Sequence, residues 1–322
     1  MTQAPESQGA KPSRKMLLLR TAGSLLALAL LIYLLSKQGW DEILVALRQI
    51  PVSHLLLALG LMFVSRLAVV GRWHVLLTSS GFNISYWQSL RITFAGLFAS
   101  NFLPTTIGGD VVRLAGAVQN RQDPAVAAAS LIVDRLVGMA GMLLAVPFSL
   151  AAVSRADIFN NLPSSSRSIQ ILSLGLWAPI RKIYLKALGI VKRLFDAAGI
   201  WLRQPRSLLI SLGFTWINML CLFGILDLLL GDIDKPVSYW LIGGLYALVY
   251  FFTLIPISIN GYGLQEVSMT FLFTQVAGVP LSSALTAAVL FRTLMMVTSL
   301  PGAVFVPGML TRTPESTDIS EA

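Results

Sequence analysis

Long uncharged runs of apolar residues recur along the chain and are separated by short polar links. Such runs include 21–36, 207–226, 267–291 and 293–311. A helix needs about 20 mostly apolar residues to cross a bilayer. The pattern therefore predicts an all-α, polytopic integral membrane protein with about seven or eight helical spans. We expect spans at roughly 16–36, 53–75, 124–153, 207–230 and 283–309, and a weaker candidate at 168–180.

Two apolar stretches, 84–114 and 238–280, are interrupted by Pro, Gly and hydroxyl residues, in LPTTIGGDVVR and IPISINGYGLQE. Pro and Gly release backbone groups that lipid cannot satisfy, so each interruption must be buried in protein or face water. We expect two broken or re-entrant helices. Each interruption ends in an acid, Asp110 or Glu266, and an arginine, Arg135 or Arg292, follows at nearly the same separation. This repetition favours an inverted repeat around a central site, although a match this short also arises by chance.

Composition supports a membrane protein, because 55% of the 322 residues are hydrophobic and 12% are charged. Soluble domains carry about 25% charged residues. The formal charge of +9 lies mostly in links between spans, as the positive-inside rule requires, so it predicts no nucleic-acid partner. The distribution of the basic residues predicts a multi-pass protein with both termini cytoplasmic. We expect this protein in the cell membrane, most simply a bacterial cytoplasmic membrane. The basic segment 181–206 is an amphipathic surface helix or a plain linker, and Arg72 with Trp73 forms an interfacial anchor.

The polar ends 1–15 and 311–322 are expected to be disordered tails around a single transmembrane domain, 16–310. The two interruptions of that domain carry the candidate chemistry. Free amides at the start of a half-helix bind anions, hydroxyl groups bind phosphate or sugar oxygens, and arginine clamps a phosphate through paired hydrogen bonds. Charges inside a membrane mark a site or an ion pair. The candidate substrate-binding residues are Pro104, Thr105, Thr106, Gly108, Gly109, Asp110, Arg113, Asp134, Arg135, Ser258, Asn260, Gly261, Gly263, Glu266 and Arg292.

Simpler explanations exist for these residues. The three acids would neutralise Arg113, Arg135 and Arg292 as structural ion pairs, which would still line the cavity of the broken helices. The glycines would serve only close helix packing, and Asn260 would cap the following half-helix. Two histidines and one cysteine occur in the chain, and none lies near the interruptions in sequence. We therefore predict no cofactor, no metal site and no enzymatic activity.

The segments NFLPTTIGGDVVRLAGAVQN, LIVDRLVG, INGYGLQE and LFRTLMMVTSLPG together resemble the lysylphosphatidylglycerol synthase transmembrane family, a flippase-like domain. The resemblance covers about residues 15–310 and includes no aminoacyl-transferase domain. It implies movement of a lipid with a modified headgroup, aminoacyl, glycosyl or phosphate, between leaflets. Two alternatives remain: a non-transporting membrane partner of a lipid-synthesising enzyme or glycosyltransferase, and an intramembrane lipid-modifying enzyme. The oligomeric state is left open.

Overall fold

The computed structural model describes most of the predicted transmembrane domain, and all its regular elements there are helices. The described residues are 48, 50–102, 108–119, 123–155, 201, 203–233, 236–254 and 261–310. The expected span at 16–36, the candidate span at 168–180, most of the basic segment and the two polar tails lie outside these residues. Those expectations stay predictions.

Four helices among the described residues are long and apolar enough to cross a membrane. They are α3 (Val52–Ser79), α6 (Pro124–Ala145), α9 (Pro205–Ile233) and α12 (Leu281–Ser299), the last continued by the 3₁₀ turn η1 (Leu300–Val304). The spans predicted at 53–75 and 207–230 are confirmed as α3 and α9. Large apolar side chains such as Val52 and Leu209 are exposed on these helices, as expected of surfaces that face lipid.

The span predicted at 124–153 is confirmed over Pro124–Ala145, but its predicted end is wrong, because the chain forms a second helix there. The helix α6 ends at Ala145, and α7 (Pro147–Arg155) begins at a proline. Proline has no backbone N–H and its ring clashes with the preceding turn, so it starts helices well and continues them badly. The last predicted span, 283–309, is divided in a similar way, because Pro301 follows the end of α12 and lies in the first turn of η1.

Both predicted interruptions separate two short helices. The first divides α4 (Tyr86–Phe102) from α5 (Gly108–Gln119), and the second divides α10 (Tyr239–Thr253) from α11 (Leu264–Ala277). Each of the four helices is shorter than the roughly 20 residues that a simple span requires. The two members of each pair pack against each other, so each broken segment is a helical hairpin.

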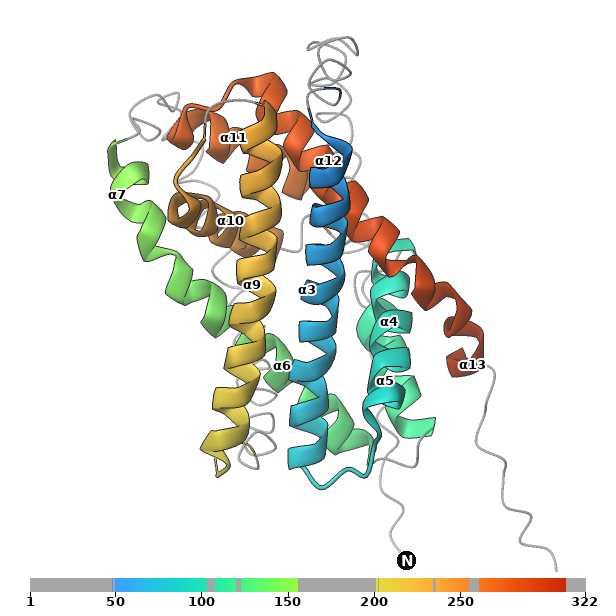
Figure 1. Ribbon diagram of the computed structural model, residues 1–322. Coiled ribbons are helices and arrows are strands. Elements are labelled where there is room, and N and C mark those ends of the chain that lie inside the picture. The colour runs from blue at the N-terminus through green and yellow to red at the C-terminus, as the bar shows by residue number, and fades with distance from the viewer. Residues whose placement is uncertain are drawn as a thin grey trace, which may run out of the picture.

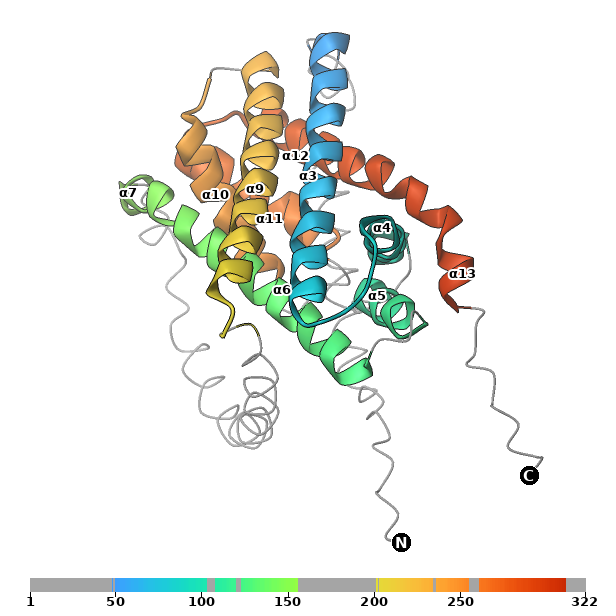
Figure 2. The ribbon, with the colours of Figure 1, turned by 60° about the horizontal axis from the view of Figure 1, so that its bottom comes forward.

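The order of helices in the first half is repeated in the second. A long helix, a hairpin and another long helix appear as α3 to α6 and again as α9 to α12. The helices α3 and α9 lie side by side and antiparallel, with the α4–α5 hairpin beside α3 and α10 beside α9, on opposite sides of the pair (Figure 1 and Figure 2).

The centre of the α3–α9 pair is marked by a hydrogen bond between residues at equivalent positions. Counted from the first residue of each helix, Ser65 of α3 and Asn218 of α9 occupy the same place. The Ser65 hydroxyl donates to Asn218 Oδ1 over 2.7 Å. Two antiparallel helices related by a two-fold axis make such equal-position contacts only where the axis passes. The contact therefore supports the inverted repeat that the two interruptions suggested.

The described apolar residues that are buried form three clusters, the third of which contains Leu76 and Trp201. The larger cluster fills the space between α3, α9, α10, α11 and α12, and a second one surrounds Trp73 between α3, α4, α5 and α6. Along α3 the chain passes from Met62, in the first cluster, through Arg66 and Arg72 to Trp73 in the second. The charged side chains of α3 are thus held between two packed apolar regions.

Glycine allows the α4–α5 hairpin to pack closely. A methyl group on Gly109 would lie 2.6 Å from the carbonyl oxygen of Gly96 and even closer to the Ser100 side chain. The residue therefore serves close helix packing, as one interpretation of the glycines proposed.

We predict that Gly109→Ala lowers the free energy of unfolding by about 1–3 kcal/mol, the usual cost of an overpacked contact. The carbonyl of Gly96 cannot move without displacing α4. The measurement is thermal unfolding of the purified protein in detergent. The control is Gly213→Ala on α9, where a methyl group meets nothing within 4 Å. Equal losses in both variants would contradict the role given to this contact.

Candidate functional site

A cavity of about 460 Å³ lies between the helices and is lined by residues of both halves. Its volume falls in the range of small-molecule sites, about 300–1,000 Å³. Tyr246, Tyr250, Thr215 and Asn218 line it together with charged side chains. Those charged lining residues are Arg66, Arg72, Asp110, Arg113, Asp134, Arg135 and Arg292.

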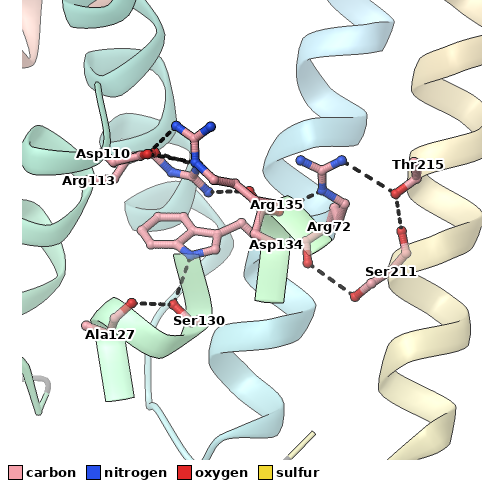
Figure 3. Close-up of polar contacts among 10 residues, drawn as sticks. Arg72, Asp110, Arg113, Ala127, Ser130, Asp134, Arg135, Ser211 and Thr215 are labelled. Atoms are coloured by element: carbon pink, nitrogen blue, oxygen red, sulfur yellow. Dashed lines mark hydrogen bonds and ion pairs between the residues drawn. The ribbon is translucent and has the colours of Figure 1, made fainter. Parts of the chain in front are cut away.

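Asp134 on α6 is the centre of the first charged cluster (Figure 3). It accepts a hydrogen bond from Arg72 Nε of α3 at 2.6 Å and from Arg113 Nη2 of α5 at 3.1 Å. The Asp134 side chain is 2% exposed, so the carboxylate would be very costly without these partners. One negative charge therefore holds two guanidinium groups from two other helices.

Asp110 forms the second ion pair of this cluster, in the first turn of α5. Its carboxylate accepts hydrogen bonds from Arg135, on α6, and also lies 3.8 Å from Arg113 (Figure 3). The Arg135 side chain is 51% exposed and that of Asp110 is 23% exposed, so this pair is more open than Asp134. Asp110 and Asp134 thus form ion pairs with Arg135 and Arg113, and these four residues line the cavity. Both points agree with the alternative that the acids neutralise the arginines as structural ion pairs.

The ring of Trp73 packs against the guanidinium group of Arg113. The centre of that guanidinium is 4.3 Å from the Trp73 ring, and Trp73 Nε1 donates to Ser130 Oγ at 3.1 Å. The interpretation of Arg72 and Trp73 as an interfacial anchor is wrong, because α3 continues to Ser79 and both side chains are enclosed. The cation–π contact fixes Arg113, while its Nε has no hydrogen-bond partner in the part of the chain that the structure describes.

The second hairpin holds an equivalent ion pair. Arg292 Nε of α12 donates to Glu266 Oε1 of α11 at 2.5 Å, and Arg292 Nη2 donates to the Gly261 carbonyl at 3.3 Å. Both side chains of the pair are buried. Gly261 and Gly263 have φ values of +72° and +74°, a region in which glycine pays no steric penalty. These glycines therefore shape the turn before α11.

Tyr262 joins the second hairpin to the first. Its hydroxyl donates to the carbonyl of Asn101 near the end of α4, and its ring lies 4.9 Å from the Arg292 guanidinium. Asn101 in turn donates to Ser299 Oγ of α12 at 3.0 Å. The two interrupted regions thus meet at the cavity although they are far apart in sequence.

Arg66 differs from the other cavity arginines because it forms no ion pair with any described carboxylate. The residue is 6% exposed, and its Nε and Nη2 have no hydrogen-bond partner among the described residues. Among the described residues, five arginines line the cavity, and three acids, Asp110, Asp134 and Glu266, pair with four of them. Five positive and three negative charges leave this part of the structure with a formal charge of +2.

The structure places the candidate residues unevenly. Asp110, Arg113, Asp134, Arg135, Gly109, Gly261 and Arg292 line one cavity, Gly108 begins α5, Gly263 precedes α11, and Glu266 holds Arg292. Pro104, Thr105, Thr106, Ser258 and Asn260 lie outside the described residues, and their roles stay predictions.

Sequence reasoning missed several residues that line the cavity. Arg72 was assigned to the membrane surface, and no signal other than its position in a long apolar helix marked it as buried. Asn218, Tyr246 and Tyr250 are polar side chains within the apolar runs of α9 and α10. A polar residue inside an apolar run is the sequence signal that could have identified them. In the described part of the chain, no group of three or more His, Cys, Asp or Glu residues is placed to hold a metal ion.

Comparison with protein families gives a match to the lysylphosphatidylglycerol synthase TM region over residues 20–302. The match contains both hairpins and every charged residue that lines the cavity in the described part of the chain. The chain belongs to this family. A search of curated proteins found no match. Membership of a family of membrane domains, together with the four long apolar helices, identifies a multi-pass membrane protein whose function is related to membrane lipids.

We predict that Asp134→Asn lowers the free energy of unfolding by about 3–5 kcal/mol, the cost of breaking a buried ion pair. Arg72 and Arg113 would keep buried charges without the carboxylate they share. Thermal unfolding in detergent measures the change, and Asp110→Asn is the matched control because its pair is more exposed. If Asp110→Asn were the more destabilised variant, Asp134 would not be the centre of the cluster.

Proposed function

We propose that the protein moves a lipid with a modified, phosphate-containing headgroup between the two leaflets of the membrane. The observation that carries the proposal is the cavity among membrane-spanning helices. Its described lining residues, together with Glu266, which pairs with Arg292, leave a formal charge of +2. An isolated charge in the bilayer is costly and marks a site that uses it. A net positive cavity is complementary to the negative charge of a lipid phosphate.

The physical task of such a protein is to carry a polar headgroup past the hydrocarbon core. A phosphate crossing unaided would lose its hydration without replacement. Guanidinium groups held in fixed positions replace that hydration with charge-assisted hydrogen bonds. The cavity is large enough for a headgroup of small-molecule size, and the acyl chains would stay in the surrounding lipid.

The acidic residues of the site have a different role in this proposal. Asp110 holds Arg135, and Glu266 holds Arg292, so each hairpin supplies an acid that fixes one arginine. Asp110 is also partly exposed to the cavity and would contact a hydroxyl or ammonium group of the headgroup. This division of roles suits a lipid that carries both a phosphate and a polar substituent.

The geometry favours translocation over the two alternatives. A non-transporting partner of another enzyme has no need of a charged cavity within the membrane. An intramembrane enzyme needs a nucleophile or a general base that is free to act. Here the acids of the cavity are engaged by arginines, and neither a histidine nor a cysteine is among its described lining residues.

We expect the purified protein, reconstituted in vesicles, to move fluorescent phosphatidylglycerol between leaflets faster than protein-free vesicles do. Asp110→Asn should fold and slow this movement about tenfold, the effect of losing one charge-assisted contact of about 1.4 kcal/mol. Chemical quenching of the outer-leaflet label measures the rate. An Asp110→Asn rate equal to that of the wild type would contradict the role of Asp110, and no movement by the wild type would contradict the proposed function for this lipid.

We also expect a phosphorylated lipid to co-purify with the wild type and to be depleted at least several-fold from Arg113→Ala. Arg113 lines the cavity with an unoccupied Nε donor, and the variant removes it while Arg72 still neutralises Asp134. Mass spectrometry of bound lipids gives the result, with Arg206→Ala as control because Arg206 is exposed at the start of α9. The same membrane-average lipids in all three proteins would favour the accessory-partner alternative.

A further inference from the structure

Arg66 lies near the middle of α3, one of the long helices that cross the membrane. Its separations from the two ends of that helix, Val52 and Ser79, are nearly equal. At a rise of about 1.5 Å per residue, it is about 20 Å along the helix from either end. It is next to Ser65, whose bond to Asn218 marks the centre of the α3–α9 pair. The depth makes an unpaired charge more costly here than near a membrane surface.

The repeat shows that the fold does not require a charge at this place. The position equivalent to Arg66 in the second half is Met219, which lies equally far into its own helix and is fully buried. A methionine of similar length fills the space in α9 with no electrostatic cost. The arginine of α3 is therefore a departure from the repeat, because an apolar side chain is buried at the equivalent place.

The groups around Arg66 are hydrogen-bond donors. The amide oxygen of Asn218 accepts a hydrogen bond from Ser65. The NH₂ group of Asn218 is left to donate hydrogen bonds to a ligand. Tyr246 and Arg292 both lie close enough to interact with the charge of Arg66, and all four residues line the cavity. Two guanidinium groups, one amide NH₂ and one phenol hydroxyl thus line the same cavity, and no described carboxylate pairs with Arg66.

We propose that Arg66, with Asn218 and Tyr246, is the binding subsite for a phosphate group at the centre of the membrane, midway between the two hairpins. This inference rests on the proposed function and deepens it by naming the residues that bind the phosphate of the headgroup, whatever its other substituent is. Arg113 and Arg292, one from each half, line the same cavity.

A charge retained for a ligand has a consequence for stability. An unpaired buried guanidinium destabilises the protein when the site is empty, and replacing it by an apolar residue of similar volume removes that cost. Residues kept for function commonly lower stability in this way. A structural arginine would show the opposite behaviour, because its removal would destabilise the fold.

The first test compares the wild type, Arg66→Met, Arg66→Lys and the control Arg206→Met, each reconstituted in vesicles. Movement of fluorescent phosphatidylglycerol should fall about 10- to 100-fold in Arg66→Met, the range for hydrogen bonds to a charged group. Arg66→Lys keeps the charge and should retain part of the rate, and Arg206→Met should be unchanged. A full rate in Arg66→Met would overturn the proposal.

The second test measures melting temperature in detergent without and with added ligand. Arg66→Met should melt at the same temperature as the wild type or higher, and added phosphatidylglycerol should stabilise the wild type alone, because only a protein that binds the lipid gains from it. A lower melting temperature in Arg66→Met together with unchanged stabilisation by lipid would show that Arg66 is structural and would overturn the proposal.

Two further ligands separate this subsite from the proposed function. A neutral glycosyl diacylglycerol has no phosphate and should neither stabilise the wild type nor compete with phosphatidylglycerol; stabilisation equal to that by phosphatidylglycerol would contradict a phosphate subsite. Free glycerol phosphate supplies the phosphate without acyl chains. If it stabilised the wild type but not Arg66→Met, while no lipid moved in vesicles, the subsite would stand and the proposed lipid translocation would fail.

Discussion

Five guanidinium groups of the described helices are held inside a membrane-spanning bundle, and the arrangement of the other polar residues follows from that constraint. Each charge must be paired or be used by a ligand, because hydrocarbon cannot solvate it. Asp110, Asp134 and Glu266 meet this requirement for four arginines. The pairs join α5 to α6, α3 to α6, and α11 to α12. The same contacts that neutralise the arginines therefore fix the helices that surround the cavity.

The inverted repeat explains why such a site lies at the centre of the molecule. A hairpin that does not cross the membrane brings its interruption to the interior, where protein can satisfy the freed backbone groups. Two such hairpins, one from each half, meet where Tyr262 bonds to the carbonyl of Asn101. Neither half alone would enclose a cavity. The symmetry is broken at Arg66 and Met219, where the first half carries a charge and the second half does not.

Sequence alone predicted the features that depend on local chemistry. The approximate bounds of α3 and α9 follow from the length of their apolar stretches, and the two interruptions follow from Pro and Gly, which act on their own segment. Features that depend on distant partners were missed or only partly predicted. The contact of Arg72 with Asp134 joins residues 62 positions apart, and nothing in their own segments indicates it. The division at Pro147 was missed because the apolar run continues through the proline. The length of that run led to the prediction of a single span.

The depth at which each arginine is held bears on how a headgroup would move. Arg135 is half-exposed and its acid is partly exposed, whereas Arg66 and Arg292 are almost fully buried. A phosphate entering beside the first hairpin would meet a charge that water still reaches, and would then meet charges that water does not reach. Electrostatic attraction strengthens as the surrounding medium becomes less polar, so the gain from each arginine rises along this path while the hydration of the phosphate is lost. In the proposed translocation, an arginine that pairs with no described carboxylate, near the middle of α3, would offset this loss where it is largest.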